Sequence, residues 1–304
     1  MHLSKRLKYT WRVVKKAALD LNEDNCFRFS AALSFYTLFS IAPLILLTIY
    51  VAGIFADDAA VRTEIITQMR NLVGDRGVEG LEVLMGNLQR EDQNIFSLAL
   101  GIGILLFSAT NIFIQLQISF NEIFQVRTID GVGFKKLLYD RIISLGMILS
   151  LGFIMMTTLV LDAIVISLIK FLFKEGSELS ALLLTIGENV ILYGIATAVL
   201  YALFRFLPDV IIKNRFLWIG SAITTILIFL GKFLISWYIG NSNFSELSGA
   251  SSSIIILMLW VYYSSVILFF GVELIKAQAH ESDVYLPAAR YAKKIKFVEV
   301  QNND

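Results

Sequence analysis

Charged side chains interrupt the long apolar segments of this sequence, among them Glu188, Arg205, Lys232 and Glu273. An ionisable group inside hydrocarbon is costly unless it is paired or hydrated, so each position is a functional candidate. At the helical rise of about 1.5 Å per residue, Glu188 and Lys232 lie roughly 12 and 10 Å from the outer ends of consecutive antiparallel segments. We therefore expect these two opposite charges to pair.

Arg205 and Glu273 lie near the other ends of their segments, where a second pair is one interpretation. Two alternatives to a functional role are open for both pairs, the second of them especially for Arg205 and Glu273. An ion pair can serve only to fix the register of two helices. Long side chains near a helix end can also reach the lipid headgroups without any partner.

Uncharged polar and aromatic residues supply further candidates in the first, second and sixth apolar segments. Ser108, Asn111 and Gln115 occur at i, i+3 and i+7, which predicts one polar stripe facing other helices or water. Interhelical hydrogen bonding is the simpler interpretation of this stripe. A proline inside an apolar segment predicts a kink or a polar pocket, and aromatic residues far from a segment end predict a lined interior. These remaining candidates for a polar pathway or pocket are Tyr36, Ser40, Pro43, Trp260, Tyr262 and Tyr263.

The residues needed for most enzyme chemistry are missing from the sequence. It contains two histidines, each near one end, and a single cysteine, Cys26. There is no HExxH, CxxC, Walker or nucleophile-elbow motif, and Gly131 and Gly133 form a lone GxG that is typical of a turn. We therefore expect no catalytic residue, no metal site and no cofactor, and a protein that is not an enzyme.

The composition places these residues in a membrane protein. The 304 residues are 57% hydrophobic and only 17% charged, which is too little charge for a soluble surface. Six apolar segments reach the roughly 20 residues that a helix needs to cross a bilayer, and lipid requires such segments to be helical. The expected spans are 29–55, 95–120, 138–161, 181–207, 216–239 and 251–275.

The basic residues predict how these spans are oriented. Of the 26 Lys and Arg residues, nineteen lie in the N-terminal segment, in the tail, in the second connection (between the second and third spans) and in the fourth connection (between the fourth and fifth spans). Since basic loops remain on the cytoplasmic side, we expect both termini to be cytoplasmic. The formal net charge of +1 gives no support for a nucleic-acid partner.

Three segments lie outside the expected membrane domain of residues 29–275. Residues 1–28 predict a basic amphipathic helix, which either binds anionic headgroups or packs on the protein's own cytoplasmic face. Residues 56–94 predict an external helical hairpin between the first two spans, which is either a docking site for an envelope partner or a lid. Residues 276–304 predict a cytoplasmic tail.

Five stretches of the sequence together resemble the YihY/BrkB family of bacterial inner-membrane proteins. The last of them is the most specific, and the resemblance extends over about residues 10–280. The stretches are ALSFYTLFSIAPLILL (32–47), LQISFNEIFQVR (116–127), LYALFRFLPD (200–209), WIGSA (218–222) and SGASSSIIILMLWVYYSSVILFFGVELIKA (248–277).

The resemblance implies an all-α, multi-pass protein of the bacterial inner membrane with six transmembrane helices. Its motifs fall here on Tyr36, Ser40, Pro43, Asn121, Arg205, Pro208, Gly220, Trp260, Tyr262, Tyr263 and Glu273. It implies transport or lipid translocation, driven by a gradient or passive because no nucleotide-binding motif is present. A non-catalytic envelope scaffold or virulence-associated protein is the alternative. The ribonuclease BN label attached to the family conflicts with the missing metal site and basic groove.

Overall fold

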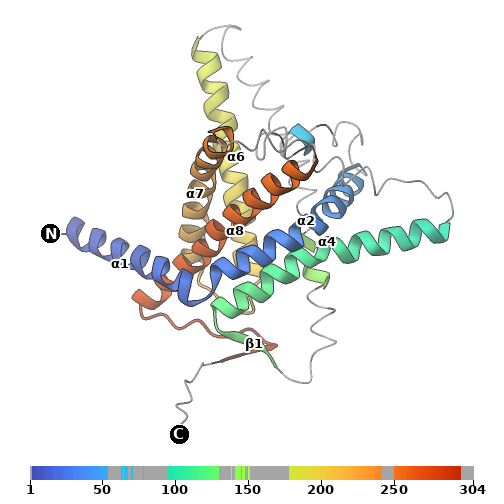
Figure 1. Cartoon of the computed structure of the whole chain (residues 1–304). Coiled ribbons are helices and arrows are strands. Elements are labelled where there is room, and N and C mark those ends of the chain that lie inside the picture. Colours follow the sequence, from blue (N-terminus) through green and yellow to red (C-terminus); the bar gives the residue numbers. More distant parts are fainter. Residues whose placement is uncertain are drawn as a thin grey trace.

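The protein is mostly helical. A computed structural model describes residues 2–53, 95–129, 178–241 and 250–295, with scattered positions between 63 and 78 and between 138 and 150. Six long helices lie in these ranges (Figure 1). They are α1 (His2–Glu23), α2 (Cys26–Gly53), α4 (Ile95–Ile123), α6 (Glu178–Phe206), α7 (Asn214–Asn241) and α8 (Ala250–Glu281).

Five of the helices, α2, α4, α6, α7 and α8, cover expected membrane spans. By length and composition, three described stretches are apolar enough to cross a membrane: Asn189–Phe206, Asn214–Leu234 and Ile254–Glu281. The expected third span, 138–161, lies largely outside the described residues. So does the expected hairpin 56–94, although Ile65 and Val78, one from each of its halves, are buried.

The helices converge at one end of the molecule, which we call the base. Here the first turns of α2 and α7 meet the last turns of α4, α6 and α8, and α4 and α6 then leave in different directions (Figure 1). Phe120 of α4 packs against Phe204 of α6 and Phe269 of α8, with ring centroids 5.9 and 6.0 Å apart. Phe29 of α2 adds an edge contact to Phe269 at 6.2 Å. This aromatic cluster is the core that joins the four helices.

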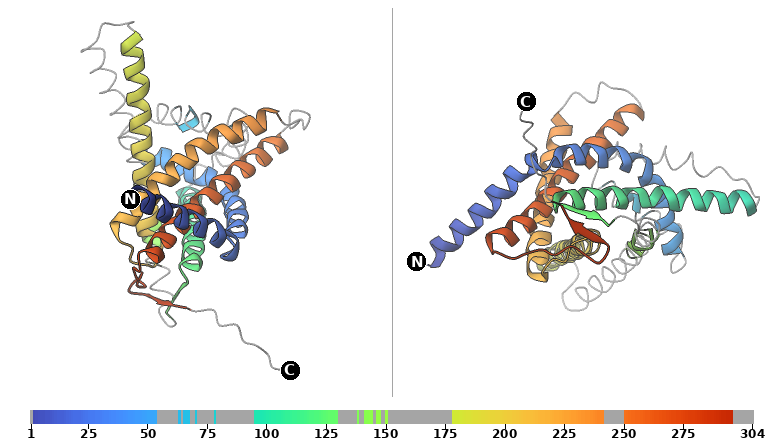
Figure 2. Two further views of the ribbon diagram at one scale, coloured as in Figure 1. Left: turned by 90° about the vertical axis from the view of Figure 1, so that its left-hand side faces the viewer. Right: turned by 90° about the horizontal axis from the view of Figure 1, so that it is seen from below.

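A small sheet, which the all-α prediction did not include, lies at the base of the mostly helical structure. Strand β1 (Val126–Thr128) follows α4 and pairs antiparallel with β2 (Ala292–Lys294) in the tail. A bridge between Val210 and Ala288 joins the α6–α7 connection to the same tail. Seen from below, the sheet lies across the helix ends (Figure 2). These short strands were missed because their partners are far apart in the sequence and neither has a strand pattern of its own.

Three helices end at residues with a left-handed backbone. Asn25, Gln125 and Asp283 have φ values of 57°, 53° and 51°, and they follow α1, α4 and α8. A left-handed residue at this position ends a helix by letting the next amides bond back to its last carbonyls. The break at Asn25 separates α1 from α2, so α2 begins at Cys26, three residues before the start that the sequence predicted at residue 29.

Helices α7 and α8 pack side by side through small residues (Figure 2). A Cβ atom added to Gly220 would overlap the Ile275 side chain, and one added to Gly271 would overlap Thr224 Oγ1. Thr224 satisfies its hydroxyl by donating to the Gly220 carbonyl at 2.7 Å. Small residues bring two backbones close, which is how helices gain contact area where lipid competes for apolar surface.

The N-terminal helix α1 packs on the last turns of α8. Its buried face is formed by Val13 and Ala17, which contact Leu274 and Ala277. Spacings of three and four in the sequence predict a different apolar stripe, through Leu3, Leu7, Trp11, Val14, Ala18 and Leu21. Of its described side chains, Leu21 is half-buried, whereas Trp11, Val14 and Ala18 are exposed. Packing on the protein's own face is therefore present, through the smaller side chains, and the larger apolar side chains of α1 face outward.

Candidate functional site

The most concentrated chemistry in the described residues is a buried group at the base, which we call the ionic cluster. It consists of Asp20 and Asp24 at the end of α1, Cys26 at the start of α2, and Glu273 and Lys276 near the end of α8. The break after α1 turns the chain back on itself, which brings Asp24 and Cys26 beside α8. Glu273 and Lys276 share one helical face because they are three residues apart.

One ammonium group serves three carboxylates in the ionic cluster. Lys276 Nζ forms a hydrogen-bonded ion pair with Asp24 and lies 3.3 Å from Glu273 Oε2 and 3.9 Å from Asp20 Oδ2. Lys16 adds a second ammonium at the edge, 3.3 Å from Asp20. Glu273 is 0% exposed, and its Oε2 has no hydrogen-bond partner. Asp20 Oδ2 and Glu273 Oε2 are therefore buried carboxylate oxygens that accept no hydrogen bond from the described residues.

Cys26 completes the cluster as a neutral donor. Its Sγ lies 3.7 Å from Glu273 Oε1, to which the thiol donates. Burial raises the pKa of the Cys26 thiol far above its ordinary value, and the Glu273 carboxylate raises it further. The thiol is thus held in its protonated, unreactive form.

A second polar group fixes the α6–α7 connection at the base. Asn121 Nδ2 donates to Asp209 Oδ2 at 2.8 Å, and the Asp209 backbone amide donates to Asn121 Oδ1 at 2.8 Å. Arg205 Nη1 donates to the Ile212 carbonyl at 2.8 Å. Arg205 and Glu273 therefore do not form the second ion pair considered from the sequence. Arg205 closes its own connection, and Glu273 belongs to the ionic cluster.

The other described candidates do not gather into one site. Ser40 is buried, and Asn111 and Gln115 are half-buried on α4. Tyr36 is 43% exposed on α2. Lys232 is half-buried on α7. The side chains of Pro43, Ser108 and Glu188 lie outside the described residues, so the expected Glu188–Lys232 pair stays a prediction.

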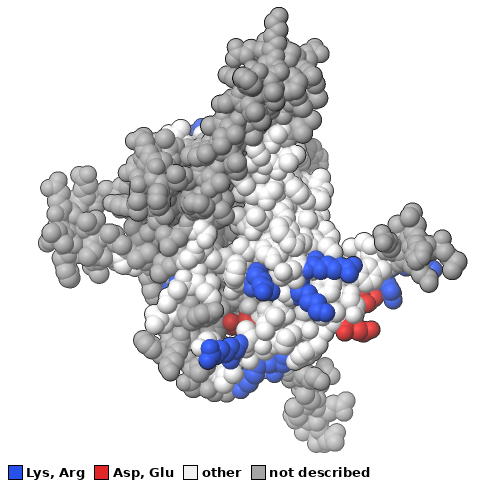
Figure 3. Space-filling model, turned by 180° about the vertical axis from the view of Figure 1, so that it is seen from behind, with Lys and Arg blue, Asp and Glu red and all other residues white. Residues whose placement is uncertain are grey.

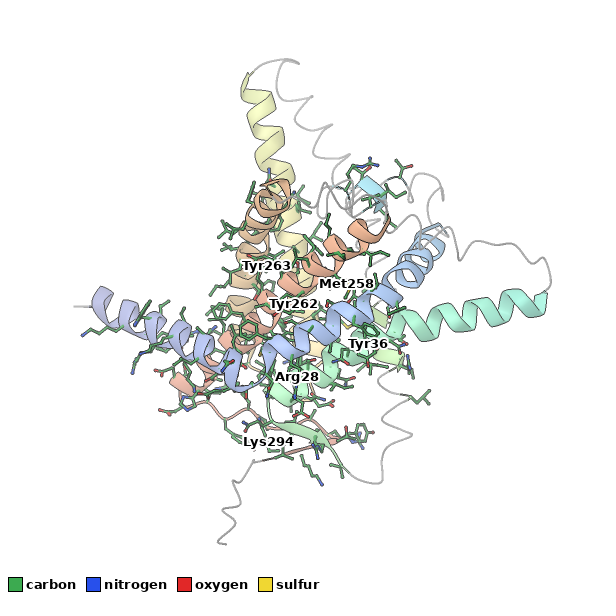
Figure 4. All side chains as sticks on the ribbon, viewed as in Figure 1. Arg28, Tyr36, Met258, Tyr262, Tyr263 and Lys294 are labelled. Atoms are coloured by element: carbon green, nitrogen blue, oxygen red, sulfur yellow. The ribbon has the colours of Figure 1, made fainter. Side chains whose placement is uncertain are left out.

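The aromatic candidates of α8 lie above the base (Figure 4). Trp260, Tyr262 and Tyr263 are half-buried. Tyr263 approaches α7 so closely that a Cβ atom on Gly231 would lie 2.5 Å from its Cε1. Arg28 and Lys294, in contrast, lie lower in the same view, toward the sheet (Figure 4). Tyr263 thus packs within the α7–α8 interface.

Four members of the ionic cluster were missed by the sequence reasoning: Asp20, Asp24, Cys26 and Lys276. A signal was present, because Lys276 follows Glu273 at i+3 and Asp20 and Asp24 share one face of α1 at i and i+4. What the sequence does not contain is the contact between α1 and α8. Within the described residues, no group of three or more His, Cys, Asp or Glu side chains is arranged to hold a metal ion.

The basic side chains of the protein are concentrated near the base, where the helices converge. On the face seen from behind, Lys and Arg side chains gather mainly around the base, and the described surface above them is largely uncharged (Figure 3). At this end the start of the second connection and the α6–α7 connection each pair with the tail, and the N-terminal helix packs on the end of α8. They are the segments that carry most of the basic residues in the sequence.

Comparison with known proteins gives one family match. The family described as virulence factor BrkB matches residues 17–296. This confirms the resemblance found in the five sequence stretches. No solved structure matches the chain significantly.

Curated relatives carry the name UPF0761 membrane protein. One from Saccharophagus degradans is 23% identical over 269 residues, covering 86% of this chain and 60% of the relative. One from Alcanivorax borkumensis is 25% identical over 271 residues, covering 86% and 60%. One from Alteromonas mediterranea is 24% identical over 256 residues, covering 83% and 82%. The chain thus spans about 60% of the length of the first relatives it matches.

Proposed function

Because the chain belongs to the virulence factor BrkB family of membrane proteins, we propose that it carries a solute or a lipid across the bacterial inner membrane. The protein crosses this membrane six times, with both termini in the cytoplasm. It has no nucleotide-binding site of its own, so transport is passive or is driven by a gradient. It catalyses no covalent reaction.

The ionic cluster carries this proposal. Glu273 is fully buried in the apolar stretch Ile254–Glu281, where a carboxylate has a high desolvation cost. A structural ion pair would match one carboxylate with one ammonium group, whereas Lys276 is shared among three. Chains of buried acidic side chains are typical of proton relays in pumps and transporters. We infer that the cluster takes up and releases a proton as the helices around it move.

The arrangement of the base supports the proposed orientation. The basic connections meet at one end of the molecule, as expected if all of them lie on the cytoplasmic side. Helix α2 begins at the base and α8 ends there (Figure 1), as expected if both termini lie on the same side of the membrane. Trp11 and Trp218 are exposed near the base. Exposed tryptophans are typical of the membrane–water interface.

The proposal is tested by reconstituting the purified full chain into phosphatidylethanolamine and phosphatidylglycerol vesicles. One arm follows fluorescent phospholipids by their bleaching with dithionite, and the other follows proton flux with an internal pH dye. We expect protein-dependent movement in at least one arm. Glu273→Gln should reduce it at least about tenfold, because the variant cannot exchange a proton.

Glu23→Gln is the matched control, since Glu23 is exposed at the end of α1 and lies outside the ionic cluster. It should leave the rate unchanged. Rates equal to those of protein-free vesicles in both arms, from protein that elutes as a folded species, would overturn the transport proposal. The non-catalytic envelope scaffold would then be the better explanation.

A further inference from the structure

A cavity of about 160 Å³ lies at the base, where α1 crosses the start of α7 and the end of α8. It is separate from the ionic cluster. Its lining includes Tyr9 and Val14 of α1, Arg215 and Ile223 of α7, and Gln278 of α8. Neither the family match nor the names of the relatives assign any role to this position.

The polar groups at this cavity are hydrogen-bond donors without enough acceptors. Gln278 is only 4% exposed, and its Nε2 has no hydrogen-bond partner among the described residues. An amide NH₂ buried without an acceptor is destabilising, so its presence indicates that an acceptor binds here. Arg215 places an exposed guanidinium at the same cavity and makes no ion pair with the described residues.

The walls of the cavity change from polar to apolar along α7. Arg215 and Ile223 are eight residues apart, which is about 12 Å along a helix. Beyond Ile223, the same face of α7 continues as exposed apolar side chains at Ile226, Leu230 and Phe233. A ligand that matches this change from polar to apolar walls has an anionic end rich in hydrogen-bond acceptors and a long apolar part.

Exposed tryptophans mark the level of this cavity relative to the membrane. Trp11 on α1 is 69% exposed and Trp218 on α7 is 53% exposed, and the ring of Trp218 contacts that of Tyr201 with a centroid distance of 4.7 Å. Tryptophan is enriched at the level of the headgroups. Because α1 and α7, which carry these tryptophans, also line the cavity, we take its opening to lie at the depth of the lipid phosphates.

We infer that this cavity binds the headgroup of an anionic glycerophospholipid. The Arg215 guanidinium and the Gln278 amide hold the phosphate oxygens, the apolar walls enclose the glycerol backbone, and an acyl chain lies along the exposed apolar face of α7. The bound lipid fills the space between α1 and α7 and so ties α1 to the membrane domain. The inference does not depend on whether the protein moves lipids.

Native mass spectrometry of the delipidated full chain tests the inference by titration with phosphatidylglycerol. Arg215→Gln should weaken the first binding event about tenfold or more, the scale of a lost charge-assisted hydrogen bond. Gln278→Leu, which keeps the volume and removes the donor, should weaken it several-fold. Lys213→Gln is the matched control, because Lys213 is exposed two residues away and does not line the cavity.

Three results would overturn the inference. Equal weakening by Arg215→Gln and Lys213→Gln would indicate non-specific attraction to a basic surface. Displacement of the lipid by millimolar inorganic phosphate would indicate a site for a free anion. Equal affinity for phosphatidylcholine would remove the role of the anionic headgroup. Melting curves of all three variants test whether they fold. If vesicle transport fails while phosphatidylglycerol still binds, only the proposed function is contradicted.

Discussion

The contacts of Glu273 differ from those that its position in the sequence suggested. From its position it was a candidate for a pair with Arg205, but α8 directs it toward the end of α1 and the start of α2. There it shares Lys276 with two other carboxylates. The group is costly to bury, and we attribute its presence to proton exchange.

Cys26 provides a direct probe of the ionic cluster. Burial and the nearby Glu273 carboxylate raise its pKa, so the thiolate is absent at neutral pH. A maleimide applied to the folded protein at pH 7.5 should therefore leave this single cysteine unmodified, and unfolding in detergent and denaturant should restore labelling. Mass spectrometry of the intact chain measures the added mass.

The raised pKa of Cys26 also predicts how the free energy of unfolding changes with pH. A raised thiol pKa keeps the folded protein neutral at Cys26 while the unfolded chain ionises near pH 8.5, so the stability contribution is complete below that pH and falls above it. Cys26→Ala should remove this part of the loss of stability at alkaline pH.

The control for the labelling experiment is His280→Cys in the Cys26→Ala background. This position is exposed on α8 and should react with the maleimide within minutes. Rapid labelling of native Cys26 would contradict the burial.

At the scale of elements, the α7–α8 pair depends on the absence of side chains at two glycines. Gly220 faces Ile275, and Gly271 faces Thr224 and Phe204. Since Phe204 is also part of the aromatic cluster, a displacement at Gly271 would reach the contact with α4. The two helices are therefore positioned by the same packing that forms the base.

Gly271→Ala should destabilise the protein, because the added methyl group overlaps Thr224 Oγ1. We expect a loss of about 1–3 kcal/mol, the usual cost of overpacking. Gly194→Ala is the matched control on α6, where nothing lies within 4 Å of the added Cβ. It should be neutral or stabilising by about 0.5–1 kcal/mol, because alanine favours a helix over glycine. Thermal melting in detergent measures both, and equal melting temperatures would contradict the close packing of α7 on α8.

At the scale of the whole molecule, the base gathers segments from every part of the chain. The end of α1, strand β1, the α6–α7 connection and the tail meet there, joined by the sheet and by the Val210–Ala288 bridge. One end of the membrane domain is thus closed by backbone hydrogen bonds between distant segments. This end carries the ionic cluster and the proposed lipid site.

The proposed orientation predicts a pattern of cysteine labelling in intact cells. In the Cys26→Ala background, a membrane-impermeant maleimide should label Asp57→Cys, which lies in the expected external segment 56–94. It should label His280→Cys at the base only after the cells are permeabilised. The reverse pattern would place the base outside and contradict the orientation expected from the basic residues.

The sequence alone determined the helices and the class of protein. Apolar segments longer than about 20 residues must be helical in lipid, and this is a local property that each segment carries by itself. The helices of the structure accordingly begin and end within a few residues of the expected limits, as in α7 (Asn214–Asn241) against 216–239. Family membership was likewise readable from the five motif stretches.

Only the tertiary structure decided which of these residues meet. Val13 and Ala17 face α8 because small side chains permit close approach, although the apolar period of α1 favoured the Trp11 stripe. The pairing of β1 with β2 and the gathering of Asp20, Asp24 and Cys26 around Lys276 join residues from opposite ends of the chain. Such contacts depend on how several helices pack at once, and no local pattern encodes them.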